Sequence, residues 1–138
     1  MAARPGVKRR RIGIAVALAA VACGLAVHLG AADTAASDIA GDALYVVAMW
    51  GGLVALFPRL SSWPIGAIVV AWSVGVELFQ LTGLPVAWAG EWPPIVLVFG
   101  TVFDARDLLV YAVTGAVLAT TDAAVRRALG RRAASAAA

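Results

Sequence analysis

Apolar residues along this chain gather into four long runs that are separated by short polar breaks. A helix rises about 1.5 Å per residue, so a run of roughly 17–25 residues crosses the ~30 Å hydrocarbon core of a bilayer. The sequence therefore predicts four transmembrane helices, at about residues 12–31, 39–57, 65–84 and 107–123. They form one all-α domain over residues 12–125, between a basic tail at 1–11 and a basic, alanine-rich tail at 126–138. We expect the alanine-rich end to be disordered.

The first run also has the basic start and apolar centre of a secretory signal peptide. A cleaved leader is therefore the alternative to a retained helix. We expect a retained helix, because the run is longer than the apolar part of a typical signal peptide and three more runs follow it.

The breaks between the later runs differ in character. Pro58 and Pro64 bracket a tight connection between the second and third runs, because proline cannot continue a helix. Residues 86–103 form the least regular stretch, and their apolar part is too short to cross a membrane as a helix. We therefore expect an interfacial or re-entrant element there, with Trp88 and Trp92 at the depth of the lipid headgroups.

The composition agrees with an integral membrane protein, and the charges indicate its orientation. Apolar residues make up 62% of the chain, charged residues 14%, and the mean hydropathy is +0.90. Ten basic residues and one acid, Asp122, lie at the termini and around Arg59, whereas the other side holds Arg106 against seven acids. This excess of basic residues predicts that the protein lies in the cell membrane with both termini on the cytoplasmic side. We also expect Asp122 to pair with Arg126, one helical turn away. Because the basic residues flank spans, the pI near 9.8 does not indicate nucleic-acid binding.

Polar side chains recur on one face of three predicted helices. Ser73, Glu77 and Gln80 are spaced by four and three residues, which places them on one side of the third helix. The second and fourth helices repeat this arrangement, and all three faces reach the outer half of the membrane in the predicted topology. We therefore predict that eight side chains converge there on a ligand: His28, Asp42, Tyr45, Glu77, Gln80, Arg106, Asp107 and Tyr111.

Ionisable groups inside a membrane helix need partners. A charged side chain at the helix centre costs about 2.5–3.5 kcal/mol on insertion scales, so we interpret Glu77 and Asp107 as functional residues. For Glu77 the partner is expected to be a ligand, a proton of its own if burial raises its pKa, or one of five residues: His28, Tyr45, Gln80, Arg106 and Tyr111. The alternative for the glutamine and the two tyrosines is that they link helices, at about 0.6 kcal/mol per interhelical hydrogen bond.

Metal binding and catalysis are alternatives with less support. His28 with Asp42, Glu77 and Asp107 supplies nitrogen and oxygen ligands, but the chain has no HxxxH, ExxH or CxxC spacing. We therefore expect no metal and no other cofactor. The residues also favour a non-enzymatic protein, since the single histidine and the single cysteine, Cys23, face different ways on one helix. Glu77 with Asp107 as an acid/base pair is the enzymatic alternative.

Two residue types are assigned mainly to packing. Five glycines are predicted to let helices approach closely: Gly24, Gly51, Gly52, Gly75 and Gly115. The five tryptophans are predicted to anchor the helices at the membrane interface or to pack between them: Trp50, Trp63, Trp72, Trp88 and Trp92.

The polar positions also resemble a family pattern. Four segments carry the resemblance to the small bacterial membrane proteins grouped as domain of unknown function 2809: Asp42-x-x-Tyr45, Leu56-Phe57-Pro58-Arg59, Glu77-x-x-Gln80 and Asp107-Leu-Leu-x-Tyr111. The resemblance spans about Ile39 to Leu118 and implies a four-helix membrane protein, without an established reaction. The signature residues that it implies are Asp42, Glu77, Gln80, Asp107 and Tyr111. The chain is more distantly similar to VanZ-like proteins, but Tyr111 stands where that family has asparagine, which favours the first family.

These observations lead to one main functional hypothesis. We expect a multi-pass, non-enzymatic membrane protein whose acidic and aromatic pocket in the outer leaflet binds a lipid headgroup, a cell-envelope precursor or a cationic small molecule. Its expected partners are the lipid bilayer and that ligand, and a homo-oligomer is left open. The alternatives are a small proton- or cation-conducting oligomer and a structural subunit of a larger membrane complex.

Overall fold

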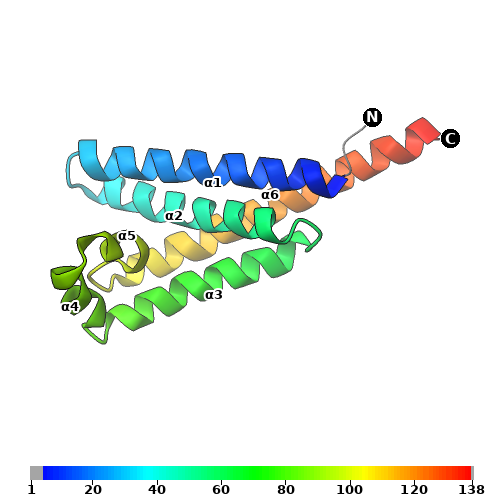
Figure 1. Cartoon of the computed structure of the whole chain (residues 1–138). Helices are drawn as coiled ribbons and strands as arrows, with labels where there is room; N and C mark the ends of the chain where they lie inside the picture. Colours follow the sequence, from blue (N-terminus) through cyan, green and yellow to red (C-terminus); the bar gives the residue numbers. More distant parts are fainter. Residues whose placement is uncertain (1–4, 138) are drawn as a thin grey trace.

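The computed structural model describes residues 5–137, and every regular element among them is a helix (Figure 1). The first four residues of the predicted basic tail and Ala138 lie outside this range. Four long helices run along one another: α1 (Pro5–Gly30), α2 (Ala35–Leu56), α3 (Ser62–Gln80) and α6 (Ala105–Ala137). Three short elements lie between α3 and α6 in the chain: α4 (Leu84–Glu91), the 3-10 turn η1 (Pro93–Ile95) and α5 (Val96–Phe99). All four long helices are long and apolar enough to cross a membrane, which agrees with the predicted number of spans.

Several helix ends differ from the prediction: α2, α3 and α6 each begin two to four residues earlier than expected, and other ends differ as follows. The third helix ends at Gln80 and Leu84 opens α4, because the chain turns at Gly83, whose φ of 72° glycine adopts readily. The last helix continues to Ala137, so the prediction of a disordered alanine-rich end was wrong. Alanine has the highest helix propensity of all residues, which accounts for the continuation. The N-terminal tail is likewise helical from Pro5 onward.

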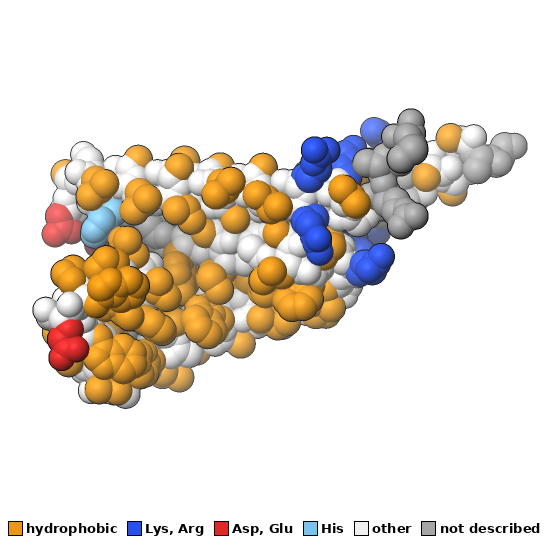
Figure 2. Space-filling view, in the orientation of Figure 1, with side chains coloured by type: hydrophobic (Ala, Val, Ile, Leu, Met, Phe, Trp, Pro, Cys, Tyr) orange, Lys and Arg blue, Asp and Glu red, His pale blue; other side chains and the backbone are white. Residues whose placement is uncertain are grey.

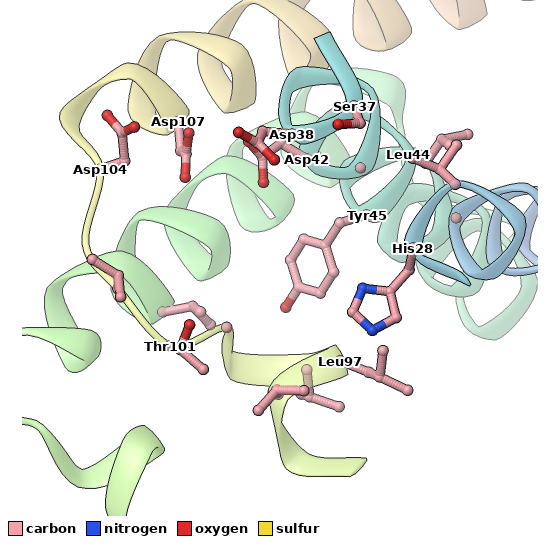
Figure 3. A pocket seen from close by; sticks show the side chains of 18 of the residues that line it. His28, Ser37, Asp38, Asp42, Leu44, Tyr45, Leu97, Thr101, Asp104 and Asp107 are labelled. Carbon is pink, nitrogen blue, oxygen red and sulfur yellow. The ribbon is translucent and has the colours of Figure 1, made fainter. Parts of the chain in front are cut away.

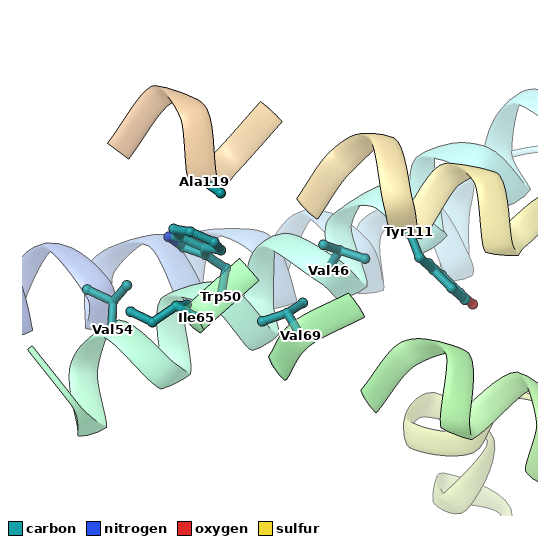
Figure 4. Packing of buried hydrophobic residues seen from close by; sticks show 7 residues of the cluster. All are labelled: Val46, Trp50, Val54, Ile65, Val69, Tyr111 and Ala119. Atoms are coloured by element: carbon teal, nitrogen blue, oxygen red, sulfur yellow. The ribbon is translucent and has the colours of Figure 1, made fainter. Parts of the chain in front are cut away.

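The long helices pack as two pairs that share one core. α1 lies along α2 and α3 lies along α6, while α2 also contacts both members of the second pair (Figure 1). Within the described residues, the backbone of α1 has no close contact with α3 or α6. Buried side chains of α2, α3 and α6 form the core (Figure 4): Val46, Trp50, Val54, Ile65, Val69, Tyr111 and Ala119. The first helix is therefore attached to the bundle mainly through α2.

α1 and α2 approach so closely that their backbones touch. A Cβ atom added to Gly51 would lie 2.6 Å from the backbone nitrogen of Ala17, and one added to Gly13 would lie 2.7 Å from the carbonyl oxygen of Gly51. Small residues allow such close packing between membrane helices. Gly115 has the same role between α6 and Val70 of α3, so close approach is confirmed at two of the five predicted glycines. The prediction of close helix approach is wrong for the other three glycines, where an added Cβ would meet nothing closer than 3.9 Å: Gly24, Gly52 and Gly75.

Most charged residues gather at the two ends of the bundle, and the face shown in Figure 2 is largely apolar between them. Basic side chains other than Arg106 lie at the end where α1 begins and α6 ends, and acidic ones other than Asp122 lie at the opposite end, where α2 and α6 begin. At the basic end, Asp122 pairs with Arg9 of α1 at 2.6 Å and accepts a hydrogen bond from Ser62 of α3. The predicted pair of Asp122 with Arg126 is wrong, because the neighbouring helix already brings a guanidinium to this carboxylate. Arg126 donates to the carbonyl oxygen of Leu60 instead.

Candidate functional site

Glu77 is the centre of a hydrogen-bonded group at the acidic end of the bundle, and it is only 1% exposed. Its Oε1 accepts a hydrogen bond from the hydroxyl of Tyr111 at 3.0 Å, and its Oε2 accepts one from the backbone N–H of Asp104 at 3.2 Å. The same tyrosine hydroxyl lies 3.5 Å from Oδ1 of Asp42. A hydroxyl has a single proton to donate, so the shorter bond, to Glu77, is the stronger one. Carboxyl groups of α2 and α3 thus meet around one phenol of α6.

The sequence around Asp104 explains why α6 begins beside Glu77. The side chain of Asp104 accepts a hydrogen bond from the backbone N–H of Arg106 at 2.8 Å, as the residue that caps a helix N-terminus does. Its backbone N–H donates to Glu77, so α3 satisfies a donor that lies just before α6. Asp104 was not among the predicted site residues. An aspartate directly before an apolar run is nevertheless a recognisable signal for a helix start.

Arg106 neutralises acids other than Glu77. Its guanidinium lies 3.1 Å from Asp104, 3.6 Å from Asp38 and 3.9 Å from Asp107. Within residues 5–137 no ion pair joins Arg106 to Glu77, so the prediction of Arg106 as its partner is wrong. The donors that reach Glu77 in the structure are a phenol and a backbone amide, neither of which carries a charge.

Gln80 ties the short helices to α3. Its Nε2 donates a hydrogen bond to the carbonyl oxygen of Phe99 at 2.8 Å. Its Oε1 is buried and has no hydrogen-bond partner in the part of the chain that the structure describes. The ring of Phe99 also packs against Phe79 of α3 and Trp88 of α4, with ring centroids 5.5 Å and 6.3 Å away. One hydrogen bond and an aromatic cluster therefore hold α4 and α5 against the end of α3.

Tyr45 and His28 extend from α2 and α1 toward α5 and Leu97 (Figure 3). The hydroxyl of Tyr45 accepts a hydrogen bond from the indole N–H of Trp72 at 2.8 Å, which fixes the position of the phenol. Trp72 was not among the eight predicted site residues. The sequence could have indicated it, because the indole N–H of a tryptophan within a span needs a hydrogen-bond acceptor.

All eight predicted site residues line one open hollow of about 940 Å³ at the acidic end of the bundle. Figure 3 labels His28, Asp42, Tyr45 and Asp107 among them. Carboxyl, phenol and amide groups from α2, α3 and α6 supply its polar wall. The lining also includes apolar side chains, among them Val21 and Leu25 of α1 and Leu97 of α5. The structure thus brings the predicted residues together, and their binding of a ligand stays a prediction.

The metal alternative lacks geometric support. No three His, Cys, Asp or Glu side chains in the described residues are arranged so that they could hold a metal ion. In Figure 3 the ring of Tyr45 lies between His28 and the carboxyl groups of Asp42 and Asp107. The nitrogen and oxygen ligands considered from the sequence therefore do not form one set.

Gly100→Ala is expected to detach the short helices from α3. Gly100 has φ 61° and ψ −164°, a region that essentially only glycine adopts, and an added Cβ would lie 2.5 Å from Nε2 of Gln80. We expect the free energy of unfolding to fall by about 1–2 kcal/mol, measured by denaturant titration of the purified protein. Gly90→Ala in α4 is the control, because an added Cβ there meets nothing within 4 Å. Equal stability of the two variants would contradict this role of Gly100.

Comparison with known proteins gives one match. Residues 31–115, which include every predicted site residue except His28, match the protein-family model described as "Protein of unknown function (DUF2809)". No curated protein and no solved structure matches the chain. The match confirms the first resemblance seen in the sequence, and none of the comparisons bears out the more distant one to VanZ-like proteins.

Proposed function

We propose that this chain, which belongs to the DUF2809 family of proteins of unknown function, is a non-enzymatic membrane protein that binds a ligand beside Glu77. The observation that carries the proposal is the Oε1 atom of Gln80, a buried acceptor that lines the hollow and has no hydrogen-bond partner within residues 5–137. A buried polar atom left without a partner costs about 1–3 kcal/mol, which a bound ligand would recover. The ligand is a lipid headgroup, a cell-envelope precursor or a cationic small molecule.

The combination of polar and apolar side chains in the lining of the hollow favours an amphiphilic ligand. A polar head would meet the carboxyl and phenol groups of α2, α3 and α6, while an apolar chain would lie along Leu25 and Leu97. Binding sites commonly combine a mostly apolar wall with a few polar groups that orient the ligand. Such a ligand is available from the bilayer itself.

The orientation that we propose places the hollow in the outer leaflet of a bacterial cell membrane. The support is the gathering of basic side chains at the end with the termini, which favours the cytoplasmic side (Figure 2). In this orientation α4 and α5 are interfacial rather than re-entrant, with the exposed Trp92 and the half-exposed Trp88 at headgroup depth. A cysteine at residue 61 should then be labelled by a membrane-impermeant maleimide only from the cytoplasmic side.

Conduction of protons or cations by a small oligomer has less support. The core toward the basic end is filled by Trp50, Val54 and Ile65, none of which is more than 6% exposed. Conduction needs a polar or water-filled path through the membrane, and these apolar side chains interrupt one within the bundle. A role as a structural subunit remains the other alternative, and stoichiometric co-purification of other membrane proteins would favour it.

Glu77→Gln is expected to abolish ligand retention without loss of the protein from the membrane. Glutamine keeps the size of the side chain and one acceptor for Tyr111, but it removes the carboxylate. Native mass spectrometry of protein extracted with the lipids of its host should show a bound amphiphile on the wild type. We expect its occupancy to fall at least about tenfold in the variant, since a hydrogen bond to a charged group contributes about 1.5–3 kcal/mol.

Glu91→Gln is the matched control, because Glu91 is an exposed carboxylate at the same end of the bundle and does not line the hollow. Its ligand occupancy should equal that of the wild type. If Glu77→Gln only lowers the abundance of the protein, or keeps full occupancy, Glu77 has a structural role and the proposal fails.

A further inference from the structure

We infer that the head of the ligand is a primary ammonium group carried on an apolar chain, and not a phosphate; this rests on the proposed function. The inference comes from three properties of the hollow, which are the kind of hydrogen-bonding capacity left open, the sign of the charge around it and the apolar character of its remaining wall.

The buried polar atoms of Gln80 and Asp107 that lack a hydrogen bond within residues 5–137 are oxygen acceptors. Gln80 is 8% exposed, and its amide nitrogen is already bonded to the carbonyl oxygen of Phe99, so the free atom of its carboxamide is the oxygen. Oδ1 of Asp107 is a second buried oxygen that accepts no hydrogen bond from an amide, amine or phenol group in residues 5–137; the Nε atom of Arg106 lies 3.9 Å from it, and the carboxyl group of Asp42 interacts directly with that of Asp107. A ligand that satisfies these two oxygens must bring N–H or O–H donors.

The charge of the wall selects among the possible donors. Six carboxyl groups line the hollow against one guanidinium, that of Arg106: Asp33, Asp38, Asp42, Glu77, Asp104 and Asp107. An anionic head would be repelled by this wall, and a hydroxyl head would gain nothing from its charge. A primary ammonium group offers three donors and one positive charge in a compact volume, so it matches both properties.

The remaining wall fits the rest of such a molecule. The phenol of Tyr45 projects into the hollow from α2 and is held there by Trp72, so the face of an aromatic ring is available to a cation (Figure 3). Beyond it, Leu25 of α1 and Leu97 of α5 offer apolar surface to a hydrocarbon chain. An alkylammonium or an aminoacylated lipid would occupy both parts at once.

The test uses the full-length protein in phosphatidylcholine nanodiscs and three probes with the same alkyl chain, which are dodecylammonium, dodecyl phosphate and dodecyl maltoside. Native mass spectrometry measures the bound fraction of each probe across a titration. We expect saturable binding of dodecylammonium that is at least about tenfold tighter than that of the other two, the difference that one charge-assisted hydrogen bond supplies. Asp107→Asn and Asp42→Asn should each weaken ammonium binding by a similar factor, whereas Glu91→Gln should not change it.

The outcomes separate this inference from the proposed function. Tighter binding of the phosphate or of the maltoside, or ammonium binding that both aspartate variants leave unchanged, overturns the ammonium head. If one of these results is found, but the Glu77→Gln variant fails to retain the amphiphile extracted from the host, the proposed function stands with a different class of ligand. If no probe binds saturably and the host amphiphile does not depend on Glu77, both ideas fail.

Discussion

Replacing Arg9 with alanine is expected to lower the free energy of unfolding by about 2 kcal/mol, because its partly buried ion pair with Asp122 lies between exposed pairs, which contribute about 0–1 kcal/mol, and buried ones, which cost about 3–5 kcal/mol to break. The guanidinium of Arg9 donates to Asp122 of α6 at 2.6 Å and to the carbonyl oxygens of Pro58 and Leu60. It is the hydrogen-bonded tie between α1 and α6, two helices whose backbones have no close contact in the described residues. Within residues 5–137, the side chain that still donates a hydrogen bond to the Asp122 carboxylate after this loss is that of Ser62. Denaturant titration in detergent measures the change.

A double-mutant cycle and a matched control complete this test. Arg9→Ala combined with Asp122→Ala should cost clearly less than the sum of the single changes, because the double variant buries no unpaired charge. Arg11 lies two residues after Arg9, and its side chain is exposed. Arg11→Ala therefore removes the same charge but should change the free energy of unfolding by less than about 0.5 kcal/mol. Additive single effects would show that Arg9 and Asp122 do not interact.

Gly51→Ala is expected to separate α1 from α2, with a loss of about 3 kcal/mol, the upper end of the usual cost of overpacking. The new Cβ would lie 2.6 Å from the backbone nitrogen of Ala17 and 2.7 Å from the carbonyl oxygen of Gly13. Because both obstructing atoms belong to the backbone, no change of rotamer relieves the clash, and one helix must move. The same denaturant titration measures the loss.

The chain contains its own control for this change. Gly52 lies on the same helix at the next position, but an added Cβ there meets nothing within 4 Å. Gly52→Ala should leave stability unchanged or raise it by up to about 1 kcal/mol, the difference in helix propensity between the two residues. If both alanine variants are equally stable, the close approach of α1 and α2 does not contribute to stability.

Features that depend on local spacing could be predicted from the sequence. Backbone polar groups inside a bilayer must be satisfied within the chain, so long apolar runs have few options besides helices, and four of them predicted the spans. Glu77 and Gln80 share a face because three residues separate them on one helix. Their meeting with Asp107 and Tyr111 followed from the topology, since α3 ends and α6 begins at the same end of the bundle.

Features that depend on which helix lies beside which could not be predicted. The partner of Asp122 is Arg9, far away in sequence, because the long side chain of Arg9 reaches from α1 to α6, although the two helix backbones have no close contact in the described residues. The bond from Trp72 to Tyr45 depends on the rotation of α3 against α2. The end of α3 at Gln80 was missed for another reason, since the turn that follows is nearly as apolar as the helix and hydropathy does not detect it.

The length of α6 gives the helix two environments. At about 1.5 Å per residue its 33 residues extend for roughly 50 Å, whereas the 19 residues of α3 extend for roughly 28 Å and already match the hydrocarbon thickness. The last turns of α6 run past the other helices (Figure 1), and in the membrane orientation that we propose they lie in water. A short helix alone in water is marginally stable, so these turns persist because they continue a helix that the bilayer holds. Hydrogen exchange should thus begin at the C-terminal end and slow sharply near Arg126, and this boundary marks the membrane surface.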